Sequence, residues 1–354
     1  MNIKKKTALL VFLAWGVTTG KSAQKQAPVP PEKVETTEPP PAVLWHDPGN
    51  MADRSLYYGP GGKKHEPHGK FTFDKEDMNG TTPKFTVIDE DGVKWKVKLG
   101  SEARPETVAT RLVWAMGYSA DEDYFVPDLH VAGAIHLHRG ENMMTRDGTF
   151  QNVRLKRERK DKEKMGTWQW HDNPFNGTRE LLGLRVLMAV INNWDLKDEN
   201  NAVYLEKGDA DSGFKRVYLI SDLGASFGAN GLDVEHNDEK GKLEVYQHSG
   251  FIHSLSNEGV SFDTPRRPAL PILFNPPEFI SRLNLRWIGR DIPREDAEWV
   301  GQLLARLSHD QIRDAFRAGG YAPTEVEGFS QILEQRITKL NHLSEDSDDI
   351  VLRP

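Results

Sequence analysis

Alternating apolar and polar residues mark the first folded part of the chain as β-rich. KFTFDK (70–75) predicts one strand. KFTVID (84–89) and VKWKVKL (93–99) alternate on either side of Glu-Asp-Gly (90–92), a pattern typical of a β-hairpin. DLHVAGAIHLH (128–138) predicts one further strand. These segments together predict a small antiparallel sheet.

A helical repeat interrupts these strands. Val108, Leu112 and Met116 recur at the spacing of one helix face. Pro105 suits the first turn of this helix, and Gly117 suits its end. The pattern therefore predicts one helix directly after the hairpin.

The second part of the chain is predicted to be mainly helical. After Thr178, a typical N-cap residue, the segment RELLGLRVLMAVINNW (179–194) is apolar nearly all round, which indicates a helix buried in the core. NAVYLE (201–206) and FKRVYLI (214–220) predict a second hairpin. Three further helices are predicted over residues 296–307, 308–317 and 324–343, the last two opening with capping-box sequences.

The elements predict an α+β fold of two lobes. A small antiparallel-β N-lobe with one helix would span residues 56–140, and a larger, mainly helical C-lobe would span residues 141–343. The charged stretch RLKRERKDKEK (154–164) is predicted to be a solvated loop or helix face, with a docking patch for an acidic partner as the alternative. The acidic tail, residues 344–354, is expected to be flexible. Nucleotide-binding clefts form well between two such lobes.

Two segments of unusual composition precede the lobes. Residues 1–23 combine a basic start, an apolar run from Thr7 to Val17 that is short for a membrane span, and small residues after it. This is the pattern of a secretory signal peptide, and an uncleaved N-terminal membrane anchor is the alternative. Residues 24–55 contain many prolines and few apolar residues, so we expect a disordered linker.

Composition narrows the function classes. The 354 residues are 37% hydrophobic and 28% charged, an ordinary globular balance. The formal charge of -7 gives no indication of a nucleic-acid partner. The absence of cysteine excludes disulfides, a cysteine nucleophile and a lipid anchor on cysteine. We expect an exported protein, periplasmic or secreted, with no stable membrane span after signal cleavage.

The first half of the chain offers residues for binding phosphate. Phosphoryl transfer to a hydroxyl needs a cation on the phosphates and an acid that holds it. Lys98 lies on the second strand of the hairpin, and Glu106 follows in the first turn of the next helix. Lys96 shares the strand face of Lys98 and is its rival for the phosphate. Gly80 and Thr81 lie in a loop where glycine allows close backbone approach to phosphate.

The second half offers residues for catalysis and for a metal ion. Asp195 follows the buried helix, where a carboxylate can orient or deprotonate a hydroxyl, and Lys197 can offset the charge of a phosphate. Asn200, with Asn201 as its alternative, and Asp222 offer the oxygen ligands that Mg²⁺ prefers.

These motifs, in this order, resemble the protein-kinase-like superfamily. Asp195-Leu-Lys-Asp-Glu-Asn200 is similar to the catalytic-loop pattern DLKxEN, with Asn193-Trp194 in place of the usual His-Arg. Asp222-Leu-Gly224 resembles the metal-binding DFG. The stretch from Lys98 to Glu106 is similar to K-x-G-D-D-x-R-Q-D of phosphatidylinositol 3-/4-kinases. This resemblance points to the atypical branch, which includes lipid kinases, HipA-type kinases and secreted casein-kinase-like enzymes.

The resemblance implies a bilobal protein-kinase-like fold that uses ATP and Mg²⁺. It divides the candidate residues among three roles: phosphate binding by Lys98 paired with Glu106, catalysis by Asp195 and Lys197, and Mg²⁺ binding by Asn200 and Asp222.

Two departures from the family leave the acceptor open. No GxGxxG precedes the lysine strand, and no APE motif follows Asp222. We therefore expect an exported ATP-dependent phosphotransferase that moves the γ-phosphoryl group of Mg-ATP to an unknown hydroxyl acceptor, which is a protein, lipid, sugar or small molecule. The alternative is an inactive pseudokinase-like module that binds nucleotide or another protein.

Overall fold

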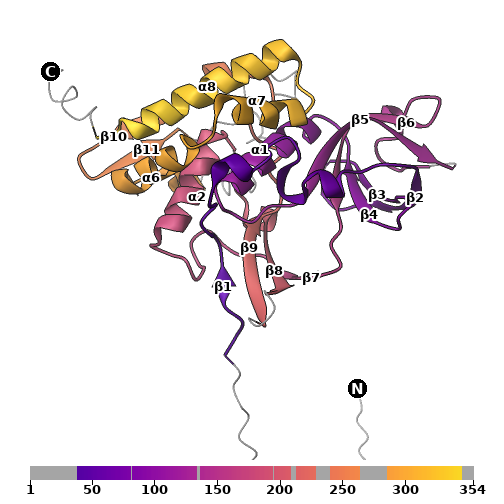
Figure 1. The fold of residues 1–354 in the computed structure, drawn as a ribbon, viewed down its shortest axis with the longest axis horizontal. Helices are drawn as coiled ribbons and strands as arrows, with labels where there is room; N and C mark the ends of the chain where they lie inside the picture. The colour runs from indigo at the N-terminus through magenta and orange to yellow at the C-terminus, as the bar shows by residue number, and fades with distance from the viewer. Residues whose placement is uncertain are drawn as a thin grey trace, which may run out of the picture. The chain divides into compact units, whose positions relative to one another are not determined.

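The computed structural model shows a mixed α+β fold (Figure 1). It describes residues 38–80, 82–133, 136–193, 195–208, 213–228, 240–263 and 285–344. All elements below lie in the compact unit Pro40–Pro354. No helix within the described ranges is both long enough and apolar enough to cross a membrane. The signal peptide predicted over residues 1–23 lies outside the described residues.

Five strands form a closed barrel in the order β2-β3-β4-β6-β5. They are β2 (Phe71–Asp77), β3 (Lys84–Ile88), β4 (Lys94–Lys98), β5 (Asp123–Ala132) and β6 (Thr149–Arg157). Neighbouring strands are antiparallel, except that β2 and β5 pair in parallel where the barrel closes. The predicted hairpin is confirmed as β3 and β4, whose turn is held by Asp89 accepting from the backbone N–H of Val93.

The barrel has its own hydrophobic core. Trp95 and Val97 of β4 point inward and are at most 2% exposed. Because side chains alternate along a strand, Lys96 and Lys98 point outward from the barrel. Helix α1 (Ala103–Ala115) follows β4 and contacts β5 and β6.

The remaining elements are mainly helical. They are α2 (Arg179–Val190), α3 (Leu243–His248), α6 (Arg294–Leu304), α7 (His309–Ala318) and α8 (Pro323–Asn341). Helix α2 is buried as predicted and packs on α6 and α8, and Figure 1 shows α8 lying along α6 and α7. These helices share a second hydrophobic core, and the apolar stripe of α1, including Val108 and Leu112, belongs to it rather than to the barrel interior.

Two small sheets complete the fold. The first has the order β1-β9-β8-β7, and the second has the order β10-β11-β12. Their strands are β1 (Ala42–Val43), β7 (Lys162–Gly166), β8 (Asn201–Lys207), β9 (Phe214–Ile220), β10 (Ile252–Leu255), β11 (Gly259–Phe262) and β12 (Ile292–Pro293). Strands β8 and β9 confirm the predicted second hairpin.

The structure corrects three boundaries in the first half of the chain. The linker predicted over residues 24–55 is not disordered throughout, because β1 pairs with β9 and Leu44 is only 2% exposed. The barrel extends past residue 140, since β6 runs to Arg157. The stretch 154–164 is not a helix face and is a loop only over residues 158–161, because it also supplies the end of β6 and the start of β7.

Other predicted ends differ by a few residues. The strand predicted over 128–138 is β5, which begins at Asp123 and ends at Ala132. Helix α2 ends at Val190, four residues before the predicted end. The capping box at Ser308 is confirmed, whereas the last helix begins at Pro323, with Glu325 rather than Glu327 accepting from the backbone at its start.

Candidate active site

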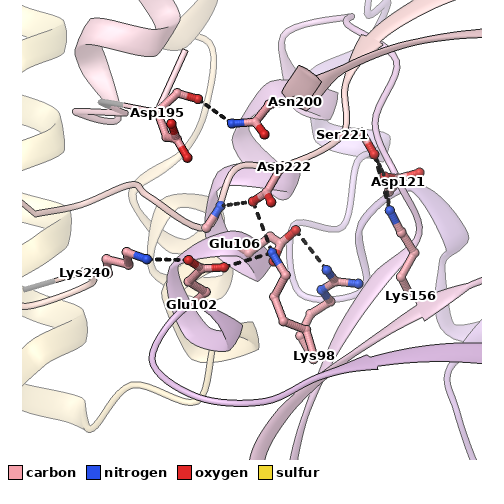
Figure 2. Close-up of polar contacts among 12 residues, drawn as sticks. Lys98, Glu102, Glu106, Asp121, Lys156, Asp195, Asn200, Ser221, Asp222 and Lys240 are labelled. Carbon is pink, nitrogen blue, oxygen red and sulfur yellow. Dashed lines mark hydrogen bonds and ion pairs between the residues drawn. The ribbon is translucent and has the colours of Figure 1, made fainter. Parts of the chain in front are cut away.

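Lys98 lies at the centre of a cluster of carboxylates from two parts of the chain, the start of α1 and the segment after β9 (Figure 2). Its Nζ lies 2.8 Å from Glu106 Oε2, 3.0 Å from Glu102 Oε2 and 3.1 Å from Asp222 Oδ1. The lysine side chain is only 3% exposed, because the first turn of α1 covers the end of β4. The strand and helix thus bring Lys98 and Glu106 together as their spacing predicts.

The carboxylates keep Lys98 charged in spite of its burial. Burial lowers the pKa of Lys98, but the charges of Glu106, Asp222 and Glu102 together raise it well above its ordinary value. Arg154 of β6, which lies opposite Lys98 in the sheet, donates to Glu106 Oε1 at 3.0 Å. Two cations therefore fix the Glu106 carboxylate, and this carboxylate fixes the ammonium of Lys98.

Asp222 lies two residues after the end of β9 and is the most accessible carboxylate of the cluster. Its side chain is 40% exposed, and its Oδ1 also accepts a hydrogen bond from the Gly224 backbone N–H at 3.2 Å. Partial burial raises the pKa of Asp222, but the charge and hydrogen bond of Lys98 outweigh this and hold the pKa below its ordinary range. Asp222 is therefore a carboxylate over the whole physiological pH range.

Asp195 lies on a loop that asparagine side chains hold in place. Asn192 has a left-handed backbone with φ of 52°, and its side chain donates to the Gly228 carbonyl at 2.6 Å. Asn193 Oδ1 accepts from the Asp195 backbone N–H at 2.9 Å, and Asn200 Nδ2 donates to the Asp195 carbonyl at 2.6 Å. Trp194 lies outside the described residues. Lys197 Nζ lies 3.8 Å from Asp195 Oδ1.

The β8–β9 hairpin carries Asn200 and Asp222 to the same end of one sheet. The Ser221 backbone N–H donates to the Asn200 carbonyl at 2.7 Å, so the two segments run side by side. In Figure 2, Asp222 lies between the Asp195–Asn200 pair and the Lys98 cluster. Asn201, the predicted alternative to Asn200, is 1% exposed and donates to the Trp168 carbonyl, so it faces the core instead.

The donor set at this sheet end fits a magnesium ion. The amide nitrogen of Asn200 is engaged by Asp195, which orients the side chain and leaves its carbonyl oxygen for a ligand. Asp222 adds carboxylate oxygens that solvent reaches. Mg²⁺ takes few protein oxygens together with water and phosphate oxygens, and these two residues supply that kind of ligand.

The predicted phosphate loop connects β2 to β3 beside the Lys98 end of β4. Gly80 has φ of 71°, a conformation that favours glycine, and its carbonyl accepts from Arg139 at 2.6 Å. The Leu99 backbone N–H donates to the Pro83 carbonyl at 3.1 Å, which ties the loop end to the residue after Lys98. Thr81 lies outside the described residues.

Of the two strand lysines, only Lys98 belongs to the cluster. Lys96 is 48% exposed, and its Nζ lies 3.6 Å from Glu158 Oε1. The two side chains share a face of β4, but α1 covers only the end of the strand that carries Lys98.

Besides Arg154, two groups of residues were not predicted. Glu102, four residues after Lys98, pairs with both Lys98 and Lys240, and its i,i+4 spacing from a lysine was the available signal. Asp121 accepts from Lys156 at 2.9 Å and from Ser221 at 3.2 Å. Burial raises the pKa of Asp121, but the charges of the neighbouring lysines outweigh it and lower the pKa to about 2.

Comparisons with known proteins do not identify a function for this chain. No family model matches the sequence, and no curated protein matches it either. Among solved structures, the chain is similar to the crystal structure of a Helicobacter pylori proinflammatory kinase, CtkA. The TM-score is 0.39 at 13% sequence identity, over 81% of this chain and 100% of that chain.

Proposed function

We propose that the protein is a kinase-like phosphotransferase that moves the γ-phosphoryl group of Mg-ATP to a hydroxyl acceptor. One observation carries the proposal. Lys98 of β4, Glu106 of α1 and Asp222 after β9 meet in one network of ion pairs, although they are far apart in the sequence. Asp195 and Asn200 are held at the adjoining sheet end. A protein-kinase-like fold of the atypical branch, with two lobes, accounts for this arrangement.

The residues divide the work of the reaction. Mg-ATP supplies the phosphoryl group and the charge that activates it. Lys98, held by Glu106, binds phosphate oxygens, and the β2–β3 loop around Gly80 approaches them with its backbone. Asn200 and Asp222 hold the metal ion.

Asp195 receives the acceptor. Its carboxylate, 26% exposed, orients the attacking hydroxyl and takes its proton, because a fixed carboxylate at that position lowers the cost of alignment. Lys197, 3.8 Å away, offsets negative charge on the transferred group. The hydrogen bonds of Asn193 and Asn200 to the Asp195 backbone preorganise Asp195 and Lys197 for this reaction.

Purified full-length protein tests the proposal. Mg-ATP should raise the thermal midpoint of wild type, because a ligand that binds only the folded state stabilises it. ATP turnover, measured as released or transferred phosphate, should fall by 10²-fold or more in Asp195→Asn, since general-base catalysis contributes about that factor. The Mg-ATP-linked rise should persist in this variant. A wild-type protein with neither stabilisation nor turnover would rule out the proposal.

One contact favours a second candidate, a pseudokinase-like module that binds nucleotide without turnover. Lys98 neutralises Asp222, the proposed metal ligand, through a direct 3.1 Å contact. Should Mg-ATP stabilise the wild type while phosphate release stays at the level of Asp195→Asn, this second candidate holds.

The proposal also covers where the enzyme acts and which molecules it meets. We place the enzyme outside the cytoplasm because residues 1–23 have the pattern of a signal peptide. Its partners would be a nucleotide and an acceptor that is a protein, lipid, sugar or small molecule, and the negative formal charge gives no reason to add nucleic acid.

A further inference from the structure

Lys84, the first residue of β3, lies next to the Lys98 cluster. Its Cα pairs directly with that of Lys98 in the β3–β4 ladder, and Arg154 pairs with Lys98 from the other side. Three cations thus form a row across three adjacent strands. A Cβ placed on Gly80 would lie 3.4 Å from Lys84 Nζ, so the ammonium lies at the glycine turn of the β2–β3 loop.

Lys84 differs from the lysines of β4 because no carboxylate of the described residues lies within ion-pair distance of its ammonium. Lys94 pairs with Asp74 at 2.9 Å, Lys96 pairs with Glu158, and Lys98 contacts three carboxylates. Among the residues that the structure describes, no carboxylate pairs with Lys84 and no hydrogen bond engages its ammonium. The side chain is nevertheless half-buried. Burial lowers the pKa of Lys84 and the charge of Lys98 lowers it further, while the charges of Asp77 and Asp222 oppose this shift without reversing it.

The charges around Lys98 explain why a second cation is useful. Lys98, Arg154 and Lys240 face the carboxylates of Glu102, Glu106 and Asp222 in this cluster. Arg154 also lies 3.7 Å from the buried carboxylate of Asp123, so the three cations face at least as many carboxylates and the cluster as a whole offers a phosphate chain no net attraction. Lys84 lies beside this set, and its charge is only partly offset by Asp77, its neighbour across the β2–β3 ladder, and by Asp222.

We propose that Lys84 is a phosphate-binding residue that, with Lys98, holds the polyphosphate of the nucleotide substrate at the Gly80 turn. This inference rests on the proposed function and adds a residue to its phosphate site. A half-buried ammonium beside another cation lowers the free energy of unfolding, and a bound polyanion would offset the repulsion between the two cations. The ligand class is therefore a nucleoside di- or triphosphate, bound through its phosphates rather than through its base.

The test compares Lys84→Met with Lys84→Arg and with Lys94→Met as a matched control from the same sheet face. Binding of Mg-ATP, magnesium tripolyphosphate and adenosine is measured on the full-length protein by calorimetry. Lys84→Met should weaken Mg-ATP and tripolyphosphate binding by about tenfold or more, the usual effect of losing a charge-assisted hydrogen bond. Adenosine binding should not change. Lys84→Arg and Lys94→Met should stay within about threefold of wild type.

A second measurement separates binding from folding. Without ligand, the thermal midpoint of Lys84→Met should equal or exceed that of wild type, because the variant removes a half-buried charge whose burial and repulsion by Lys98 outweigh its attraction to Asp77 and Asp222. A clear decrease would assign Lys84 a structural role and overturn the inference.

The result also separates this inference from the proposed function. If wild type binds Mg-ATP and Lys84→Met binds it equally well, the role of Lys84 is overturned and the phosphotransferase proposal stands. If wild type shows no response to Mg-ATP, the phosphotransferase proposal fails, and the binding of tripolyphosphate then tests the role of Lys84. Tripolyphosphate binding that is present in wild type and absent in Lys84→Met supports a phosphate site at Lys84. No tripolyphosphate binding to wild type overturns that site.

Discussion

Three carboxylates hold the ammonium of Lys98 in a nearly solvent-free position. Replacing Lys98 should therefore change both the stability of the fold and the binding of phosphate, and the two changes can be measured separately. Removing its ammonium leaves Glu106 buried with one cation fewer, which costs about 3–5 kcal/mol of folding free energy. Removing it also deletes the proposed phosphate contact. The first effect appears without ligand and the second only with ligand.

Lys98→Met and Lys96→Met therefore form a matched pair. We expect Lys98→Met to be less stable than wild type and to lose the rise in thermal midpoint that Mg-ATP produces. Lys96→Met should keep that rise, because Lys96 makes only an exposed ion pair with Glu158. Thermal unfolding with and without Mg-ATP measures both effects. The reverse pattern would mean that Lys96 is the phosphate-binding lysine.

Asp121 gives a prediction in acid. Its pKa of about 2 is below the unfolded value near 3.9, so the unfolded chain binds the proton more readily. The stability it contributes, about 2 kcal/mol, is present above pH 4 and is lost as the pH falls toward 2. In denaturant unfolding, Asp121→Asn should be less stable than wild type at pH 6, and the difference should shrink by pH 3. A pH-independent difference would contradict this assignment.

At the level of single residues, sequence spacing predicted contacts within one local unit. Lys98 and Glu106 meet because a strand leads directly into a helix. Arg154 was missed because its place beside Lys98 depends on the register between β4 and β6. Arg154 lies 48 positions after Glu106 along the chain. Nothing in the local pattern around Arg154 indicates that register.

At the level of elements, β6 shows why a strand with one irregular residue is not predicted from alternation. Phe150, Val153 and Leu155 are fully buried, but Asn152 adopts a left-handed backbone with φ of 53°. This residue shifts the alternation between Phe150 and Val153, so the apolar positions no longer follow a period of two. The charged residues at the end of β6 therefore led to the prediction of a solvated surface.

The segment around β1 was predicted as a spacer because of its prolines, yet it packs on three elements. Trp45 donates to the Met116 carbonyl at the end of α1 and stacks edge-on against Trp299 of α6. Gln311 of α7 donates to the Met51 carbonyl at 2.7 Å. The few apolar residues of this segment therefore join α1 to the helices of the second core.

Leu44→Ala tests this packing. The side chain is 2% exposed, and its truncation should lower the free energy of unfolding by about 2–5 kcal/mol, as for other buried leucines. The neighbouring Val43→Ala, at a partly exposed position, should cost less. Denaturant unfolding of the two variants measures the difference. Equal, small effects would show that this segment does not contribute to the core.

At the level of the whole molecule, the mixture of a β-rich part and a helical part was predictable because each periodicity was strong within its own region. The closure of the barrel was not, since the parallel pairing of β2 with β5 joins residues about sixty positions apart. The membership of α1 in the second core was likewise hidden, because an amphipathic stripe does not reveal which surface it meets.

Export is the prediction that belongs to the whole chain. Fractionation of cells expressing the full sequence should find the protein outside the cytoplasm and shorter by about the length of the proposed signal peptide. A version that lacks residues 1–23 should stay in the cytoplasm. Full-length protein retained in the membrane fraction would favour the anchor instead.

The sheet β1-β9-β8-β7 has a further consequence at its two outer strands. One edge is the two-residue β1, and the other is β7, whose Lys162, Glu163 and Lys164 place charges of both signs along the open backbone. Short or charged edges resist pairing with a strand of another molecule. The same charged residues that conceal β7 in the sequence should therefore oppose edge-to-edge aggregation of the folded chain. This would matter for an exported protein, which would have to refold without the cytoplasmic chaperones.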